Sequence, residues 1–222
     1  MPMLDRITEN FPLRSKMLTG ASLVLSGTVA HGLTRVLLNL LAGRALGPAD
    51  FGQLTLCLAI AQFSALLWPT SLGAATAKYV AAQPTEELET RVIHQLERWA
   101  NWGALGASII AGIAWLVVGS QSWLGVAVTA LVCFAYSEYH FSRGLLLGKR
   151  QFARSTALEV LLATTALVGG VIALALADSG LYFALCLASG FAVYAAGRGL
   201  RRARKVPISR ELRRDVRKYI SI

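Results

Sequence analysis

Long apolar stretches run along the chain, each bounded by charged or turn-forming residues. No Asp, Glu, Lys or Arg occurs from Trp99 to Ser137 or from Val160 to Ala177. About 20 consecutive apolar residues cross the hydrocarbon core of a bilayer as a helix. The pattern predicts six membrane-spanning helices: Leu18–Ala42, Phe51–Leu72, Trp99–Val118, Trp123–Phe141, Thr156–Ala177 and Leu181–Ala196. The expected fold class is therefore all-α, a polytopic membrane helix bundle.

Composition favours a membrane protein over a soluble one. Hydrophobic residues make up 55% of the chain and charged residues 15%, with a mean hydropathy of +0.54, whereas soluble domains carry about 25% charged residues. The net charge of +10 would also suit a nucleic-acid-binding protein. We reject a nucleic-acid partner because the basic residues flank the apolar stretches, where they set topology and meet anionic lipid.

The placement of Lys and Arg predicts the orientation. Twenty of the 22 lie before the first span, between spans two and three, between spans four and five, or after the sixth. Cytoplasmic loops carry the excess of basic residues, so both termini are expected in the cytoplasm. The predicted parts are a tail over 1–17, a six-helix unit over 18–197 and a basic segment over 198–222. That last segment suits an amphipathic helix on the anionic inner leaflet, or the lead-in to a seventh span.

The first span carries a polar stripe. His31, Arg35 and Asn39 are spaced by four residues, and Thr28 continues the same face. A charged stripe is costly in lipid, so it is expected to face the bundle interior or an aqueous cavity. Two interpretations remain open: a cationic site for an anionic substrate group, or an internal ion pair with Glu138 or Glu159 that fixes helix packing.

Two acidic residues lie near predicted span ends. Glu138 is a candidate proton or cation site, a partner for Arg35, or an interfacial group, and its nearness to Arg143 favours the interface. Glu159, one turn into the fifth span, can likewise extend to the interface. The sequence contains neither metal-ligand spacing nor a catalytic motif. We therefore expect no enzyme activity, no metal and no organic cofactor, and leave open a coupling ion, H⁺ or Na⁺.

The turn between the first two spans carries the most specific motif. Arg44, Gly47, Pro48, Phe51 and Gly52 fit the pattern R-x-L-G-P-x-x-F-G. Gly47 and Pro48 are expected to end one helix and begin the next, since Pro suits a first helical position. Gly52 is expected to permit close packing at the entry to the second span.

With the in-span Arg35 before this motif and the small-residue run Ser71–Ala77 after it, the chain resembles the polysaccharide-biosynthesis flippases. These belong to the multidrug/oligosaccharidyl-lipid/polysaccharide exporter superfamily. Arg143-Gly144 with Phe152 and Glu159 adds a second similarity. The resemblance implies a lobe of a multidrug-exporter-like fold in a bacterial or archaeal cytoplasmic membrane. Family members carry about twice as many spans, so it implies the N-terminal lobe alone, needing a C-terminal lobe or second subunit.

The function implied is the flipping of a lipid-linked anionic oligosaccharide, of the O-antigen type, by alternating access. Arg35, with His31, Asn39, Glu138 and Glu159, would then bind substrate, and Arg35 would meet the diphosphate. One alternative is a drug/cation antiporter of the same superfamily, for which an acid in the first span is expected. The other is a non-transporting scaffold that binds a glycosyltransferase or polymerase of envelope polysaccharide assembly.

Overall fold

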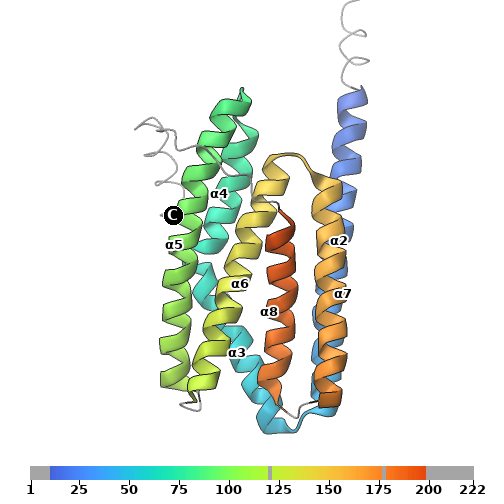
Figure 1. Cartoon of the computed structure of the whole chain (residues 1–222). Helices are drawn as coiled ribbons and strands as arrows, with labels where there is room; N and C mark the ends of the chain where they lie inside the picture. Colours follow the sequence, from blue (N-terminus) through green and yellow to red (C-terminus); the bar gives the residue numbers. More distant parts are fainter. Residues whose placement is uncertain (1–10, 120–121, 177–178, 199–222) are drawn as a thin grey trace, which may run out of the picture.

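The computed structural model describes residues 11–119, 122–176 and 179–198, and all the regular structure in these ranges is helical (Figure 1). Six helices there are long and apolar enough to cross a membrane, which confirms the predicted bundle. The helices are α2 (Phe11–Ala45), α3 (Pro48–Leu66), α4 (Pro69–Ala81), α5 (Glu86–Val118), α6 (Trp123–Gly148), α7 (Phe152–Leu176) and α8 (Gly180–Gly197). All but α4 are the candidate spans. The predicted basic segment after Arg198 lies outside the described residues.

Helix α6 is the centre of the bundle. It packs against α3, α4, α5 and α8, whereas α2 packs mainly on α7. Figure 1 shows the result: α2 and α7 lie side by side at one edge, α4 and α5 at the other, with α6 and α8 between them. The main core joins α2, α3, α5, α6, α7 and α8 through buried apolar side chains such as Ala61, Trp115, Val132, Ala166 and Phe183.

The second predicted span, Phe51–Leu72, is two helices. α3 ends at Leu66 and α4 begins at Pro69, with Trp68 in a non-helical conformation between them. Proline has no N–H and clashes with the preceding turn, so it breaks α3 and suits the first turn of α4. Trp68 then packs over Gly103 of α5, where a Cβ atom would come within 2.3 Å of the indole ring.

The segment between the second and third predicted spans is also helical. α4 continues to Ala81, and α5 begins at Glu86, where Thr85 Oγ1 accepts a hydrogen bond from the backbone N–H of Leu88. Three Glu residues in the first turn of α5 favour its start, since carboxylates stabilise helix N-termini. A helix of 33 residues is about 50 Å long, and the hydrocarbon core is about 30 Å thick. The α4–α5 hairpin therefore projects beyond the membrane.

Glycines let α4 and α6 cross closely. A Cβ at Gly144 would lie 2.1 Å from the carbonyl oxygen of Gly73, and one at Gly148 would lie 2.8 Å from Val80 Cβ. A second buried core then ties the projecting hairpin to α6: Leu72, Ala75, Val80, Val92, Leu96, Ala100, Phe141 and Leu145. These contacts hold the α4–α5 hairpin against α6 and so against the rest of the bundle.

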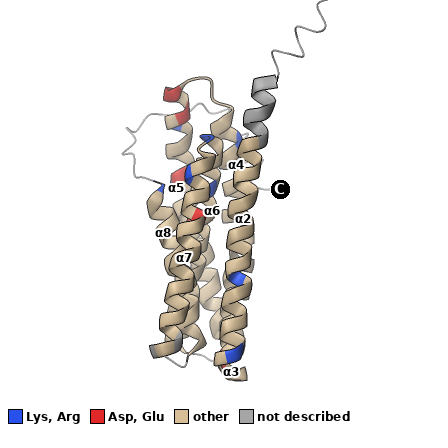
Figure 2. Ribbon diagram, turned by 90° about the vertical axis from the view of Figure 1, so that its right-hand side faces the viewer, with Lys and Arg blue, Asp and Glu red and all other residues tan. Residues whose placement is uncertain are grey.

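Charged residues gather at the end of the bundle from which the hairpin projects (Figure 2). The turn from α6 to α7 lies at this end, and Arg150 in it has φ 56°. The N–H of Gln151 bonds to the carbonyl of Leu146, and that of Arg150 to Leu147, as in a Schellman motif. That this end of the bundle is cytoplasmic stays a prediction from the placement of Lys and Arg.

Candidate functional site

A buried carboxylate on α7 organises the polar groups near the first span. Glu159 is 2% exposed. The Tyr139 hydroxyl donates to its Oε1 at 2.8 Å, and Arg143 Nε lies 3.1 Å from the same oxygen. His31 Nδ1 is 4.0 Å from Oε2. We call these four residues the Glu159 cluster; they come from α2, α6 and α7.

The Glu159 cluster attaches α2 to the bundle. Arg143 also donates from Nη2 to Thr28 Oγ1 at 2.7 Å, so one guanidinium bridges α2 and α7. The Thr156 hydroxyl donates to the backbone carbonyl of Leu23 at 2.8 Å. Gly27 permits this approach, because a Cβ there would lie 3.3 Å from Glu159 Cγ.

The expected interfacial position of Glu159 is wrong, and so is its pairing with Arg35. Its carboxylate points inward because Tyr139 on α6 donates a hydrogen bond to Oε1 and Arg143 forms an ion pair with the same oxygen. Oε2 of Glu159 and Nδ1 of His31 are buried and have no hydrogen-bond partner in the described part of the chain. Oε2 of Glu159 can therefore accept one more hydrogen bond without breaking those already made.

Arg35 and Asn39 extend the polar face of α2 away from the cluster. Arg35 is half-buried, one turn beyond His31, and Asn39 is exposed. Within the residues that the structure describes, Arg35 has no hydrogen bond and no ion pair. The stripe predicted on the first span is therefore split: His31 joins the buried cluster, while Arg35 is half-buried and Asn39 is exposed.

Glu138 is not a partner of Arg35. It is 8% exposed, and its Oε2 lies 3.1 Å from Arg198 Nη1. Arg198 also contacts Glu97 Oε1 at 3.1 Å and Ser142 Oγ at 3.3 Å. Glu138 points away from the Glu159 cluster because it is adjacent to Tyr139 on a helix, and consecutive side chains on a helix do not face the same way.

Aromatic rings surround the cluster. His31 stacks on Tyr139 with ring centroids 5.6 Å apart, and Tyr194 meets Tyr139 edge-on at 4.9 Å. Tyr136 lies 5.2 Å from Phe191 and 4.5 Å from His140. The rings shield the Glu159 carboxylate from solvent, which strengthens its contacts. No group of His, Cys, Asp and Glu side chains suited to a metal occurs among the described residues.

The turn motif has the conformation expected of it, with one exception. Gly47 is the N-cap of α3 and Pro48 its first residue, and the Phe51 N–H bonds to the Gly47 carbonyl at 3.0 Å. Phe51 packs on Gly43, where a Cβ would lie 3.6 Å from its ring. Gly52, however, has open space around it, so the expected close packing at Gly52 is wrong. Arg44 is exposed at the end of α2.

From the sequence, Arg143 was named near Glu138 and in the family resemblance but not as a site residue, and Tyr139 and Arg198 were not selected. A usable signal was present, since Tyr139 and Arg143 are four residues apart and share a helix face. The same holds for Glu138 and Ser142. What the spacing does not reveal is which face of α6 turns toward α7 and which toward α8.

No protein-family model and no curated protein matches the chain. Among solved structures, the chain is similar to the outward-facing conformation of a multidrug resistance MATE family transporter of the MOP superfamily, with a TM-score of 0.61 and 16% identity. The match covers 90% of this chain and 50% of that one, so the chain spans about half the length of the solved transporter. The chain thus has a helical fold similar to that of the solved transporter, with six helices long and apolar enough to cross a membrane.

Proposed function

We propose that the chain is the N-terminal half of a transporter that flips a lipid-linked oligosaccharide across the cytoplasmic membrane by alternating access. The observation that carries this proposal is Arg35, a half-buried cation on a membrane helix without an ion-pair partner in the described residues. An uncompensated charge in a membrane span is costly and marks a substrate or ion site. The fold and its coverage of half a transporter support the same function.

The chemistry of such a substrate fits Arg35. A lipid-linked glycan carries a diphosphate, and a guanidinium offers two parallel donors to phosphate oxygens in a site of low dielectric constant. Asn39, exposed one turn further along α2, adds an amide that can donate to a phosphate or a sugar hydroxyl. The opposite wall of the cavity would come from a C-terminal lobe or a second subunit.

Within this proposal the Glu159 cluster holds α2 in position and is the place where a coupling proton would act. Protonation of Oε2 would weaken the ion pair with Arg143, the residue that also holds Thr28 on α2. The movement of α2 would thereby be linked to the charge on Glu159.

A drug/cation antiporter is the second candidate, because the solved neighbour is a multidrug transporter and Glu159 offers an inward-facing acid. The two candidates differ in Arg35, which repels a cationic drug and attracts a diphosphate. A scaffold role in polysaccharide assembly would need neither Arg35 nor Glu159.

The test is Arg35→Ala in cells that export a surface glycan through the transporter containing this chain. We expect loss of surface glycan with normal membrane insertion, partial activity for Arg35→Lys, and normal export for Arg98→Ala, an exposed Arg on α5. Lys keeps the charge but loses bidentate contact. Normal glycan export by Arg35→Ala would refute the substrate role.

A further inference from the structure

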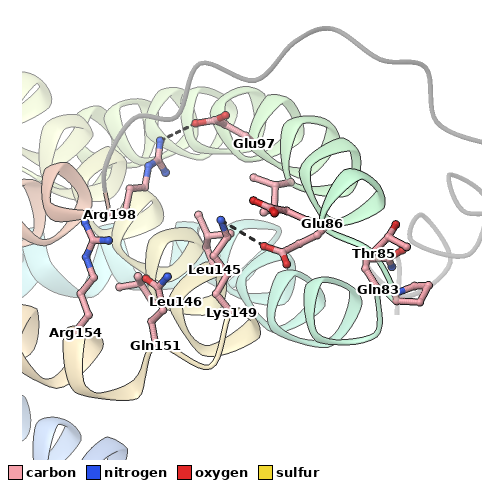
Figure 3. A pocket seen from close by; sticks show the side chains of 13 residues that line it. Gln83, Thr85, Glu86, Glu97, Leu145, Leu146, Lys149, Gln151, Arg154 and Arg198 are labelled. Carbon is pink, nitrogen blue, oxygen red and sulfur yellow. Dashed lines mark hydrogen bonds and ion pairs between the residues drawn. The ribbon is translucent and has the colours of Figure 1, made fainter.

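A polar pocket of about 660 Å³ lies between the projecting hairpin and the ends of α6, α7 and α8 (Figure 3). Its charged lining comes from four elements: Glu86, Glu89 and Glu97 on α5, Lys149 after α6, Arg154 on α7 and Arg198 after α8. None of these belongs to the Glu159 cluster, whose α6 members Tyr139 and Arg143 point toward α2 and α7. The pocket is thus a separate feature of the bundle.

The pocket walls are fixed. The glycine crossing of α4 and α6 and the second core, including Val92 and Leu96, hold α5 against α6. Two ion pairs join the walls: Lys149 Nζ lies 3.4 Å from Glu89 Oε1, and Arg198 Nη2 lies 3.1 Å from Glu97 Oε1. A pocket with fixed walls exists before its ligand arrives, which reduces the entropy lost on binding.

Charge defines the ligand class. Three carboxylates and three cations line the pocket, so the formal charges of its lining sum to zero. The carboxylates all lie on α5, and the cations lie on the walls formed by the ends of α6, α7 and α8. In Figure 3, Arg154 and Arg198 lie on one side of the pocket and Glu86 on the other. Arg154 donates from Nη2 to the Gly197 carbonyl at 2.7 Å and makes no ion pair within the described residues. A simple anion would be repelled by the carboxylates, and a simple cation would be repelled by the guanidinium groups. A zwitterion can place each of its charges beside groups of opposite sign.

The depth of the pocket along the membrane normal indicates that it lies near the lipid headgroups. Trp102 on α5 is 67% exposed, and exposed Trp side chains favour the membrane–water interface. Glu97 lies one to two turns before Trp102, about 7 Å along the helix, and Glu86 is about 16 Å further. The inner end of the pocket is therefore level with lipid headgroups, and its outer end is in water.

We propose that this pocket binds an aminoalkyl phosphate, the zwitterionic group at the end of phosphatidylethanolamine. The phosphate lies against Arg154, whose remaining N–H donors suit phosphate oxygens, with the Arg198 guanidinium beside it. The ammonium group lies toward the carboxylates at the start of α5. This site is independent of the transport proposal, because no residue of the polar stripe on α2 takes part.

The test uses the full chain in detergent with an equimolar mixture of phosphatidylethanolamine and phosphatidylglycerol of the same acyl chains, and native mass spectrometry of the retained lipid. We expect preferential retention of phosphatidylethanolamine. Arg154→Gln should lower it at least about tenfold, the order expected for a charged hydrogen bond. The matched control is Arg150→Gln, which removes the same charge four residues earlier and does not line the pocket.

Further arms separate the parts of the proposal. Combined Glu86→Gln and Glu89→Gln should abolish the preference for phosphatidylethanolamine. Soluble glycerophosphoethanolamine, which carries the headgroup without acyl chains, serves as a competitor and separates a lipid headgroup site from a site for a free metabolite. Displacement of the lipid by this compound supports recognition of the aminoalkyl phosphate that both molecules contain. Equal retention of both lipids by the wild-type chain, or equal effects of Arg154→Gln and Arg150→Gln at unchanged thermal stability, would overturn it.

Discussion

Arg143 on α6 donates a hydrogen bond to Thr28 on α2 at 2.7 Å, although 115 residues separate them in the sequence. Its Nε lies 3.1 Å from the buried Glu159 carboxylate. One side chain therefore both compensates a buried charge and holds the first membrane helix. The contact makes the stability of the bundle depend on Arg143 more than on most charged residues of the chain.

Removal of Arg143 should destabilise the fold. Arg143→Ala leaves the Glu159 carboxylate without its cation, and breaking a buried ion pair from one side costs about 3 kcal/mol. Glu159→Gln removes the charge itself, so the double variant should recover part of the loss. The measurement is denaturant unfolding in micelles. Strictly additive effects of the two substitutions would show that the pair does not interact.

The α4–α6 crossing should be intolerant of a single methyl group. At Gly144 a Cβ would lie 2.1 Å from the backbone oxygen of Gly73, which has no side-chain freedom to move away. We expect Gly144→Ala to lower the free energy of unfolding by about 1–3 kcal/mol. Gly106→Ala is the matched control, because nothing lies within 4 Å of its Cβ position and alanine favours helix. Similar losses in both variants would contradict the close crossing.

The turn from α6 to α7 should gain stability from glycine. Arg150 has φ 56°, a conformation that glycine adopts without the steric cost of a side chain. Arg150→Gly should therefore unfold with a free energy about 1 kcal/mol higher than Arg150→Ala, since both lack the charge and only alanine keeps a Cβ. Thermal unfolding of the pair separates the backbone effect from the charge effect. Equal stabilities would argue against the left-handed conformation.

A cysteine at position 35 should be open to water. In a background with Cys57, Cys133 and Cys186 replaced, Arg35→Cys should react with a membrane-impermeant thiol reagent, whereas Leu38→Cys, at a position 3% exposed, should stay protected. Reaction rates in sealed vesicles give the comparison. Complete protection at position 35 would exclude an aqueous cavity along α2.

Orientation is tested with reporter fusions. The predicted topology requires a reporter at Ile222 to be active only in the cytoplasmic mode, and one inserted after Gly119, between α5 and α6, only in the external mode. These two sites follow opposite ends of the described bundle. The reverse pattern would invert the whole assignment.

Hydropathy was enough to predict the number of spans and most of their limits, because the ability of a segment to lie in lipid depends on its own residues. It did not indicate that α5 begins at Glu86, since that part of the helix lies outside the hydrocarbon. A different signal is present there: Val92, Leu96 and Ala100 recur every four residues and are all buried. The break at Trp68 depends on Pro69, the first residue of α4, and the average hydropathy of a segment does not register a single proline.

The candidate site was harder to predict than the fold. The polar stripe on α2 is local and periodic, so its existence is readable in the sequence. The partners of Glu159 and Glu138 depend on the rotation of α6 about its axis, which packing against five other helices determines. Lone acids near span ends therefore looked interfacial, although each is buried against an Arg that comes from another part of the bundle.

The contact between α2 and α7 also governs how the protein is made. α2 leaves the ribosome first, and its main packing partner begins at Phe152. At roughly 5–20 residues per second, about ten seconds pass before α7 is synthesised. During that interval His31 lacks Glu159, its partner on α7. Until α7 is made, the polar side chains of α2 lack their native partner in the membrane, where an unpaired polar group is costly.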